Sequence, residues 1–165
     1  MSEIDYQEPP FTEILKNDSD HRHTGCASIG MLNCLHLLGI LKEQKRSEVL
    51  LDLKSSLQED SESLVVSPTN FKSFLMTTNY FDEVYSSLFF TKDLVLHEFL
   101  DILAERTIAF VIVAVPNSSL THCSVIYIQE GRLMIDGWEA DLESLARILF
   151  FGEKNFGFYL WRDHG

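Results

Sequence analysis

The chain has 165 residues, of which 45% are hydrophobic, and its 13 basic and 25 acidic residues give a formal net charge of −12. This length and composition suffice for one domain with a buried core and exclude a globally disordered chain. The acidic excess argues against binding to a nucleic-acid backbone or to anionic lipid, because both carry charge of the same sign.

Other simple features narrow the class of protein further. No apolar run reaches the ~18 residues that a membrane-spanning helix needs, so we expect no membrane span. The acidic start of the chain lacks the basic-then-apolar pattern of a signal peptide. Three cysteines are too few for a disulfide scaffold, so free thiols in a reducing compartment are expected. A cytoplasmic location follows as the expectation.

The N-terminal part predicts an arm followed by a buried helix. Residues 1–20 are polar and contain Pro9 and Pro10, which is typical of an extended arm, and we expect a single domain over residues 21–165. Residues 26–38 predict a helix that is apolar on most sides and therefore central, with Thr24 as its N-cap and Gly39 as its stop.

The middle of the chain predicts further helices. They are expected over residues 43–57, from Ser67-Pro68 to Thr77, and from a cap at Thr91 to Arg106. An acidic loop over residues 58–63 and short strands near residues 83–90 separate them.

The last third predicts a sheet. Strands are expected over residues 108–115, 122–128, 132–136 and 156–161, and Asp141 is expected to cap a short helix that ends at Leu149. Helices followed by an antiparallel sheet indicate an α+β domain, in which the central helix packs on the C-terminal sheet.

Cys26 is the first candidate for chemistry. With Thr24 as the N-cap, its thiol lies in the first helical turn, where unpaired backbone N–H groups favour the thiolate. Cys34 lies two turns deeper in the helix and Cys123 alternates away from His122 on its strand, so both are expected in the core.

His122 and Asp136 flank a predicted hairpin, and the hairpin turn decides whether they meet. With a two-residue turn, Gln129 pairs with Arg132, and His122 and Asp136 point to opposite faces. With a three-residue loop and Gly131 in the left-handed region, Ile128 pairs with Arg132 instead. Trp138 then faces His122, and Asp136 becomes its diagonal neighbour on the same face. The position of the glycine favours the three-residue loop.

These segments resemble the papain-like cysteine peptidase superfamily. The similarity lies in Thr24-Gly-Cys26-Ala-Ser28, in Thr121-His122-Cys-Ser-Val-Ile-Tyr127, and in Ile135-Asp136-Gly-Trp138. The order Cys, His, Asp also resembles the peptidase domains of bacteriocin-exporting transporters, transglutaminases, arylamine acetyltransferases, and bacterial effectors that cleave or deamidate host proteins.

The resemblance implies a papain-like fold with Cys26 as nucleophile, His122 as base and then acid, and Asp136 as the group that orients His122. Trp138 would form a wall of the site. The superfamily usually carries an oxyanion-donating Gln about six residues before the cysteine, but this chain has Asp20 there, and an ionised Asp cannot donate. Asn17 or His21 is then the candidate for the missing donor.

The predicted function is a cysteine-dependent hydrolase, a protease or a glutamine deamidase, that attacks a carboxamide of a neutral or basic protein through a thioester. An acyltransferase of the transglutaminase type would use the same triad. No cofactor is implied, and similarity to effectors extends the expected location to delivery into a host cell. A catalytically weak or inactive papain-like module that binds a protein partner is the alternative. A zinc site at His21, His23 and Cys26, with His122 as a fourth ligand, is a weaker one.

Overall fold

The structure is a computed structural model that describes residues 22–41, 48–49, 52–53, 68–114, 121–150 and 155–162. For residues 22–29, 70, 114 and 121–122 the description extends to the backbone alone. The predicted N-terminal arm and the acidic loop over residues 58–63 lie outside the described residues. So does most of the predicted helix over residues 43–57, of which residues 48–49 and 52–53 are helical.

The described part contains four α-helices and six strands, so the predicted α+β class is confirmed. The helices are α2 (Arg22–Leu37), α4 (Pro68–Thr77), α5 (Leu96–Ala104) and α6 (Leu142–Phe150), with short 3-10 turns at Asn79–Phe81 and Thr91–Asp93. The strands are β1 (Val84–Phe90), β2 (Ile108–Ala114), β3 (Thr121–Gln129), β4 (Arg132–Ile135), β5 (Trp138–Glu139) and β6 (Phe156–Arg162).

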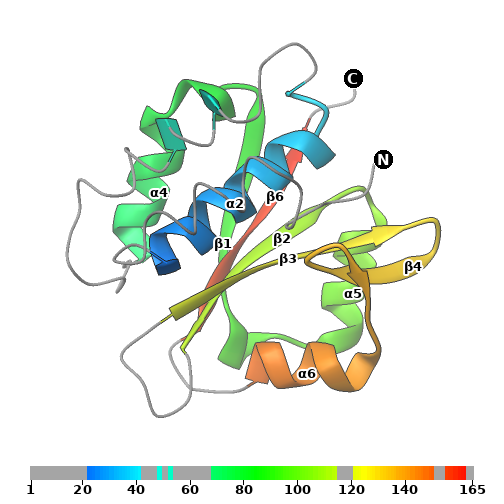
Figure 1. The fold of residues 1–165 in the computed structure, drawn as a ribbon. Coiled ribbons are helices and arrows are strands. Elements are labelled where there is room, and N and C mark those ends of the chain that lie inside the picture. Colours follow the sequence, from blue (N-terminus) through cyan, green and yellow to red (C-terminus); the bar gives the residue numbers. More distant parts are fainter. Residues whose placement is uncertain are drawn as a thin grey trace.

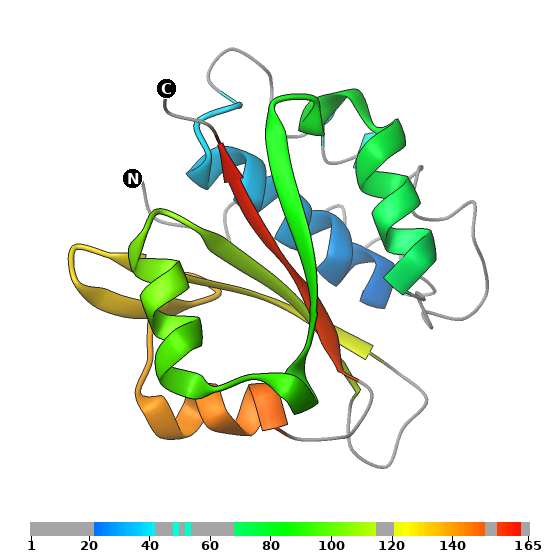
Figure 2. The same cartoon turned by 180° about the vertical axis from the view of Figure 1, so that it is seen from behind.

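One antiparallel sheet, in the order β1-β6-β2-β3-β4-β5, forms the centre of the fold. Helices α2 and α4 lie on one side of it, and α5 and α6 lie on the other (Figures 1 and 2). The sheet therefore carries a hydrophobic core on each face. The first, which we call the α2-face core, includes Leu35, Phe71, Phe110, Tyr127 and Phe158. The second, the α5/α6-face core, includes Phe99, Val111, Ile126, Leu145 and Tyr159.

Alternation along the central strands explains why both faces are apolar. On β2, Phe110 and Ile112 pack in the α2-face core, while Ala109 and Val111 pack in the α5/α6-face core. A strand that is buried on both faces needs a continuous apolar run, which is what the sequence predicted here. No helix within the described residues is long and apolar enough to cross a membrane.

Several boundaries differ from the predictions. Thr91 does not begin a long helix, because its buried hydroxyl donates to the carbonyl of Asn155, and α5 begins only at Leu96. The residues near 83–90 form one seven-residue strand instead of several short ones. Strand β4 ends at Ile135, so Asp136 belongs to a turn. The predicted cap of α6 is confirmed, since Asp141 Oδ1 accepts a 2.8 Å hydrogen bond from the amide of Ser144.

Candidate active site

Cys26 is the fifth residue of α2, because the helix begins at Arg22. Thr24 is therefore inside the helix, and the prediction that it is the N-cap is wrong. The field of a helix terminus falls off within the first turn. At its position in the second turn, Cys26 thus receives less of this support for a thiolate than a cysteine in the first turn would.

One stripe of α2 faces the sheet. A Cβ atom added to Gly30 would lie 2.5 Å from Cε2 of Phe110 on β2, so the helix approaches the sheet closely at this point. Cys34 lies four residues further along and is fully buried in the α2-face core together with Cys123 of β3. Cys26 lies four residues before Gly30, and positions at this spacing share a helix face. Its backbone position is therefore on the sheet-facing stripe.

The ends of α2 and β3 bring the two candidate catalytic positions to one side of the molecule. Helix α2 begins beside the start of β3 in both views (Figures 1 and 2). His122 is the second residue of β3 and pairs with Val113 of β2. Two segments almost a hundred residues apart in the sequence thus place Cys26 and His122 at the same end of the sheet.

The β3–β4 hairpin has the two-residue turn, so the preferred register was wrong. Gln129 pairs with Arg132, and both turn residues have positive φ, 53° at Glu130 and 76° at Gly131. A turn of this kind matches the twist of the flanking strands. The observed register also pairs Ile126 with Ile135, two members of the α5/α6-face core. Core packing therefore favours a register that requires a non-glycine residue in the left-handed region.

Trp138 does not face His122. It follows a second two-residue turn, made by Asp136 and Gly137, and pairs with Ile135 of β4. Its side chain is 71% exposed. The prediction that it lies opposite His122 is thus wrong, and its role as a wall of the site remains a prediction.

Asp136 is held against β3 by two hydrogen bonds to a single residue. Its amide donates to the carbonyl of Val125 at 2.9 Å, and its Oδ1 accepts from the amide of Val125 at 2.8 Å. With φ at 55° it is not a strand residue, so strand alternation does not set the direction of its side chain. The turn directs the carboxylate back onto β3 and fixes it there.

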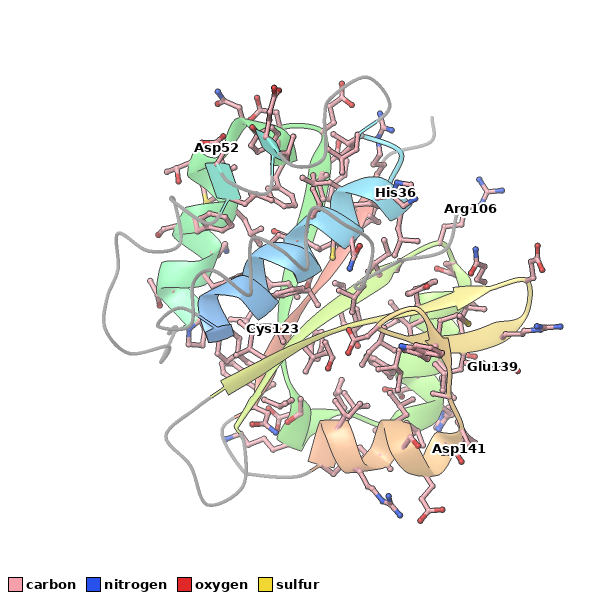
Figure 3. All side chains as sticks on the ribbon, in the orientation of Figure 1. His36, Asp52, Arg106, Cys123, Glu139 and Asp141 are labelled. Atoms are coloured by element: carbon pink, nitrogen blue, oxygen red, sulfur yellow. The ribbon has the colours of Figure 1, made fainter. Side chains whose placement is uncertain are left out.

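The charge of the Asp136 carboxylate affects a thiol on the α2 side of the sheet, that of Cys34. Burial is the main cause that raises the pKa of the Cys34 thiol far above its ordinary value, and the nearby charge of Asp136 raises it further. Cys123, labelled in Figure 3, is 4% exposed and belongs to the same core. The prediction that Cys34 and Cys123 are core residues is confirmed.

Several predicted residues lie outside the described part of the chain. Asn17, Asp20 and His21 are among them, and His23 and Cys26 are described by their backbone alone. The oxyanion donor and the zinc alternative therefore stay predictions. Among the side chains that the structure describes, no group of three or more His, Cys, Asp or Glu could hold a metal ion.

Two buried polar residues in the α2 and β3 region have no role predicted from the sequence. Asn33 of α2 is 6% exposed and Ser124 of β3 is 1% exposed. Within the described part of the chain, the Nδ2 atom of Asn33 and the hydroxyl of Ser124 have no hydrogen-bond partner. A polar residue inside an apolar helix or strand is the signal that could have drawn attention to them.

Comparison with protein-family models, with curated proteins and with solved structures finds no match for this chain.

Proposed function

We propose that this α+β domain is papain-like and is a cysteine-dependent hydrolase that attacks a carboxamide of a protein substrate. One observation carries the proposal. The sheet-facing stripe of α2, which includes position 26, begins at the end of the sheet where β3 begins with Thr121 and His122. A thiol and an imidazole at adjoining ends of a helix and a strand are the two groups that thiol-dependent acyl transfer requires.

In the proposed reaction, the Cys26 thiolate adds to the substrate carbonyl and forms a tetrahedral oxyanion. His122 gives a proton to the leaving amine, and a thioester to Cys26 remains. Water that loses a proton to His122 then attacks the thioester and releases the acid and the thiol. A peptide amine as leaving group makes the enzyme a protease, and ammonia from a glutamine side chain makes it a deamidase. An amine in place of water would give acyl transfer.

Asp136 is the proposed positioning residue for His122. The bond from the Val125 amide to Oδ1 fixes the plane of the carboxylate, and a fixed carboxylate is what an orienting partner of histidine needs. Val125 lies three residues after His122 on the same strand, roughly 10 Å along it, and the alkylation of Cys26 in Asp136 variants tests whether the two side chains interact.

The proposed substrate is a neutral or basic protein, because a net charge of −12 disfavours acidic partners. The proposed location is the cytoplasm, or a host cell into which the protein is delivered. A Cys26→Ala variant that retains bound protein from candidate extracts would supply substrates for assay. Fragment masses would then identify proteolysis, and ammonia release would identify deamidation.

The rate of iodoacetamide alkylation at each cysteine, read by mass spectrometry against pH, tests the proposal directly. Cys34 and Cys123 are internal controls, because both are buried and should react slowly in the folded protein. We expect Cys26 alone to react quickly below pH ~8.5, the ordinary thiol pKa. We expect this reaction to slow in His122→Ala and to stay fast in His97→Ala, a control at an exposed histidine of helix α5. Equally slow reaction of all three thiols would overturn the proposal.

A non-catalytic module that binds a protein segment is the second candidate, and the register of β3 favours it. Cys123, Val125 and Tyr127 pack in the α2-face core, whereas Ile126 packs in the α5/α6-face core. Regular alternation assigns position 122 to the set of Ile126, on the face away from α2. In this case Cys26 has an ordinary thiol pKa, and His122→Ala leaves its alkylation rate unchanged.

A further inference from the structure

Strand β1 forms an edge of the sheet and has none of the features that usually protect an edge. Among the described residues its only strand neighbour is β6 (Figure 2). Its sequence, Val-Tyr-Ser-Ser-Leu-Phe-Phe, contains no charge, no proline and no glycine. Its pairing with β6 runs without a bulge from Val84–Arg162 to Phe90–Phe156. A long apolar edge without charge, proline or bulge is a template for pairing with another strand.

The backbone groups on the open side of β1 follow from its register. The amide of Thr91, one residue beyond the strand, donates to the carbonyl of Asn155 at 3.0 Å. Hydrogen-bonded pairs alternate in an antiparallel ladder, so Tyr85, Ser87 and Phe89 bond to β6. The N–H and C=O groups of the even-numbered residues of β1 therefore point away from the sheet. These residues are Val84, Ser86, Leu88 and Phe90.

Apolar side chains are exposed along the same edge. Leu88 is 38% exposed, Phe90 is 40% exposed and Tyr85 is 52% exposed. Beside them, on the α2 side of the sheet, an open groove runs between α4 and β1. It is lined by Leu75, Met76, Phe81, Asp82, Val84, Ser86 and Leu160. Met76 in this groove is 74% exposed, so apolar surface continues from the strand onto the helix.

We propose that the β1 edge pairs antiparallel with β1 of a second copy of this chain, around a two-fold axis at Ser87. In this register Ser86 lies opposite Leu88 of the second copy, and Val84 lies opposite Phe90 of the second copy. These are the even-numbered residues with outward backbone groups, so each pair forms two hydrogen bonds. No other register that uses these groups pairs all seven residues of the strand.

The side chains of the two copies complement each other in this register. Leu88 and Phe90 of the second copy come to lie over Ser86 and Val84, which line the groove between α4 and β1. The exposed apolar groups of one copy thus meet the open apolar groove of the other. On the opposite face, Tyr85 lies across from Phe89 of the second copy. Tyr85 already stacks on Trp161 at a centroid distance of 5.9 Å, so an aromatic partner extends an existing contact.

Charge at the ends of the strand fits a second copy as well. Asp82 precedes the strand and Lys92 follows it, so an antiparallel pair places Asp82 of one copy and Lys92 of the other at the same end, and the two-fold axis repeats this at the other end. Asp82 and Lys92 are both exposed, so these pairs select the register more than they add affinity. Two chains of charge −12 repel each other, so salt should strengthen the association.

A disulfide engineered at the two-fold axis tests the proposal. The variants carry Cys26→Ala, so that the buried Cys34 and Cys123 are the only native thiols left. At this axis the two Cα atoms of residue 87 form a non-hydrogen-bonded pair about 4.5 Å apart, within disulfide reach. Oxidised glutathione should therefore join two Ser87→Cys chains. The two thiols are oxidised to a disulfide, and the oxidised glutathione is reduced to two thiols.

Tyr85→Cys is the matched control, because residue 85 is exposed on the same strand. In the proposed register the two copies of residue 85 are offset by four residues, roughly 14 Å along the strand, which a disulfide cannot span. We expect a covalent dimer from Ser87→Cys and none from Tyr85→Cys under the same oxidant. Equal dimer from both variants, or from neither, would overturn the register.

The reversible dimer is measured by light scattering of the full chain over a range of concentrations. Ser87→Lys places two like charges opposite each other and should raise the dissociation constant up to roughly fivefold, while Ser87→Thr should not. Asp82→Lys should weaken the dimer, and Asp82→Lys with Lys92→Asp should restore it. A wild-type chain that remains monomeric at all concentrations, in low and high salt, would sink the proposal. The cysteine chemistry proposed above is independent of either result.

Discussion

Val125 and Asp136 bond to each other through both polar backbone groups of Val125. The carbonyl of Val125 accepts from the amide of Asp136 at 2.9 Å, and the amide of Val125 donates to Oδ1 of Asp136 at 2.8 Å. If β4 continued past Ile135, a backbone carbonyl of that strand would accept the hydrogen bond from the Val125 amide. Because the strand ends at Ile135, the carboxylate takes that place and holds the turn onto β3.

Substitutions of Asp136 should therefore separate its structural role from its proposed catalytic one. Asp136→Ala leaves the Val125 amide without its acceptor and places alanine at a φ of 55°, so we expect a loss of about 2 kcal/mol in the free energy of unfolding. Asp136→Asn keeps an acceptor oxygen and tolerates this φ, so it should lose less than about 1 kcal/mol. Urea denaturation measures both values.

The same pair of variants has an informative effect on Cys26. If Asp136 positions His122, Asp136→Asn should slow the alkylation of Cys26 at neutral pH although the fold is retained, since a neutral amide stabilises imidazolium less than a carboxylate does. Unchanged alkylation in Asp136→Asn, together with lower stability in Asp136→Ala, would mean that Asp136 only stabilises the turn.

The sequence predicted the elements whose signals are local. The apolar run of β2, the left-handed stop at Gly39 and the cap at Asp141 all occur as expected. Each depends on residues within a few positions of one another, which is why propensity and capping rules suffice.

The predictions from sequence failed where a residue far away in the chain determines the local structure. Thr91 is a good cap by composition, but the carbonyl of Asn155, 64 residues away, accepts its hydroxyl proton. The hairpin turn was misjudged because core pairing of Ile126 with Ile135 outweighs the reluctance of Glu130 to adopt positive φ. The candidate site lies across this hairpin. The sequence was therefore enough to name candidate residues for this site, but not enough to predict how they are arranged.

Three glycines should respond differently to alanine. At Gly131 nothing lies within 4 Å of an added Cβ, so only the φ of 76° opposes it, and the expected loss is about 1 kcal/mol. At Gly30 the Cβ meets the ring of Phe110 at 2.5 Å, a clash of the kind that costs about 1–3 kcal/mol, less the gain in helix propensity. At Gly157 it meets the backbone oxygen of Phe110 at 2.7 Å, which cannot move aside.

We therefore expect Gly157→Ala to be the most destabilising of the three glycine variants by denaturant titration. Gly30→Ala and Gly131→Ala should both retain a cooperative unfolding transition. If Gly157→Ala were as stable as Gly131→Ala, the close approach of β6 to β2 at this point would be wrong.

Two tyrosines should make the fold sensitive to alkaline pH. Burial, and then a 2.7 Å hydrogen bond to Asp52, raises the pKa of Tyr80 from 10.0 to about 12. Burial, with Glu98 nearby, raises the pKa of Tyr159 to about 12. Both shifts mean that the fold favours the neutral phenol. Their stabilising contribution is fully present below pH 10 and is lost as pH rises from 10 to about 12.

Stability against urea should therefore fall over that interval, and tyrosinate absorbance should lag behind that of free tyrosine. Tyr80→Phe and Tyr159→Phe should each flatten the fall, and Tyr85→Phe, on an exposed residue of β1, should not. A fall of the same steepness in the Tyr80→Phe and Tyr159→Phe variants would assign the alkaline sensitivity to other groups.

Arg162 joins three elements at the end of the sheet opposite the candidate site. Its Nη1 donates to the carbonyl of Leu38, just after α2, at 3.0 Å, and its Nη2 lies 2.7 Å from Oε2 of Glu83. The first bond satisfies a carbonyl at a helix C-terminus, where a positive charge is favourable. The second is an ion pair whose carboxylate is 70% exposed, so solvent weakens it.

We expect Arg162→Lys to lower the free energy of unfolding by about 1–2 kcal/mol, because an ammonium cannot make both bonds in this fork geometry. Glu83→Gln should cost less than about 0.5 kcal/mol, and that loss should vanish in high salt because the ion pair is screened. Urea titrations of both variants at low and high salt separate the two contributions. A Glu83→Gln loss as large as that of Arg162→Lys would assign the stabilisation to the ion pair instead of the helix end.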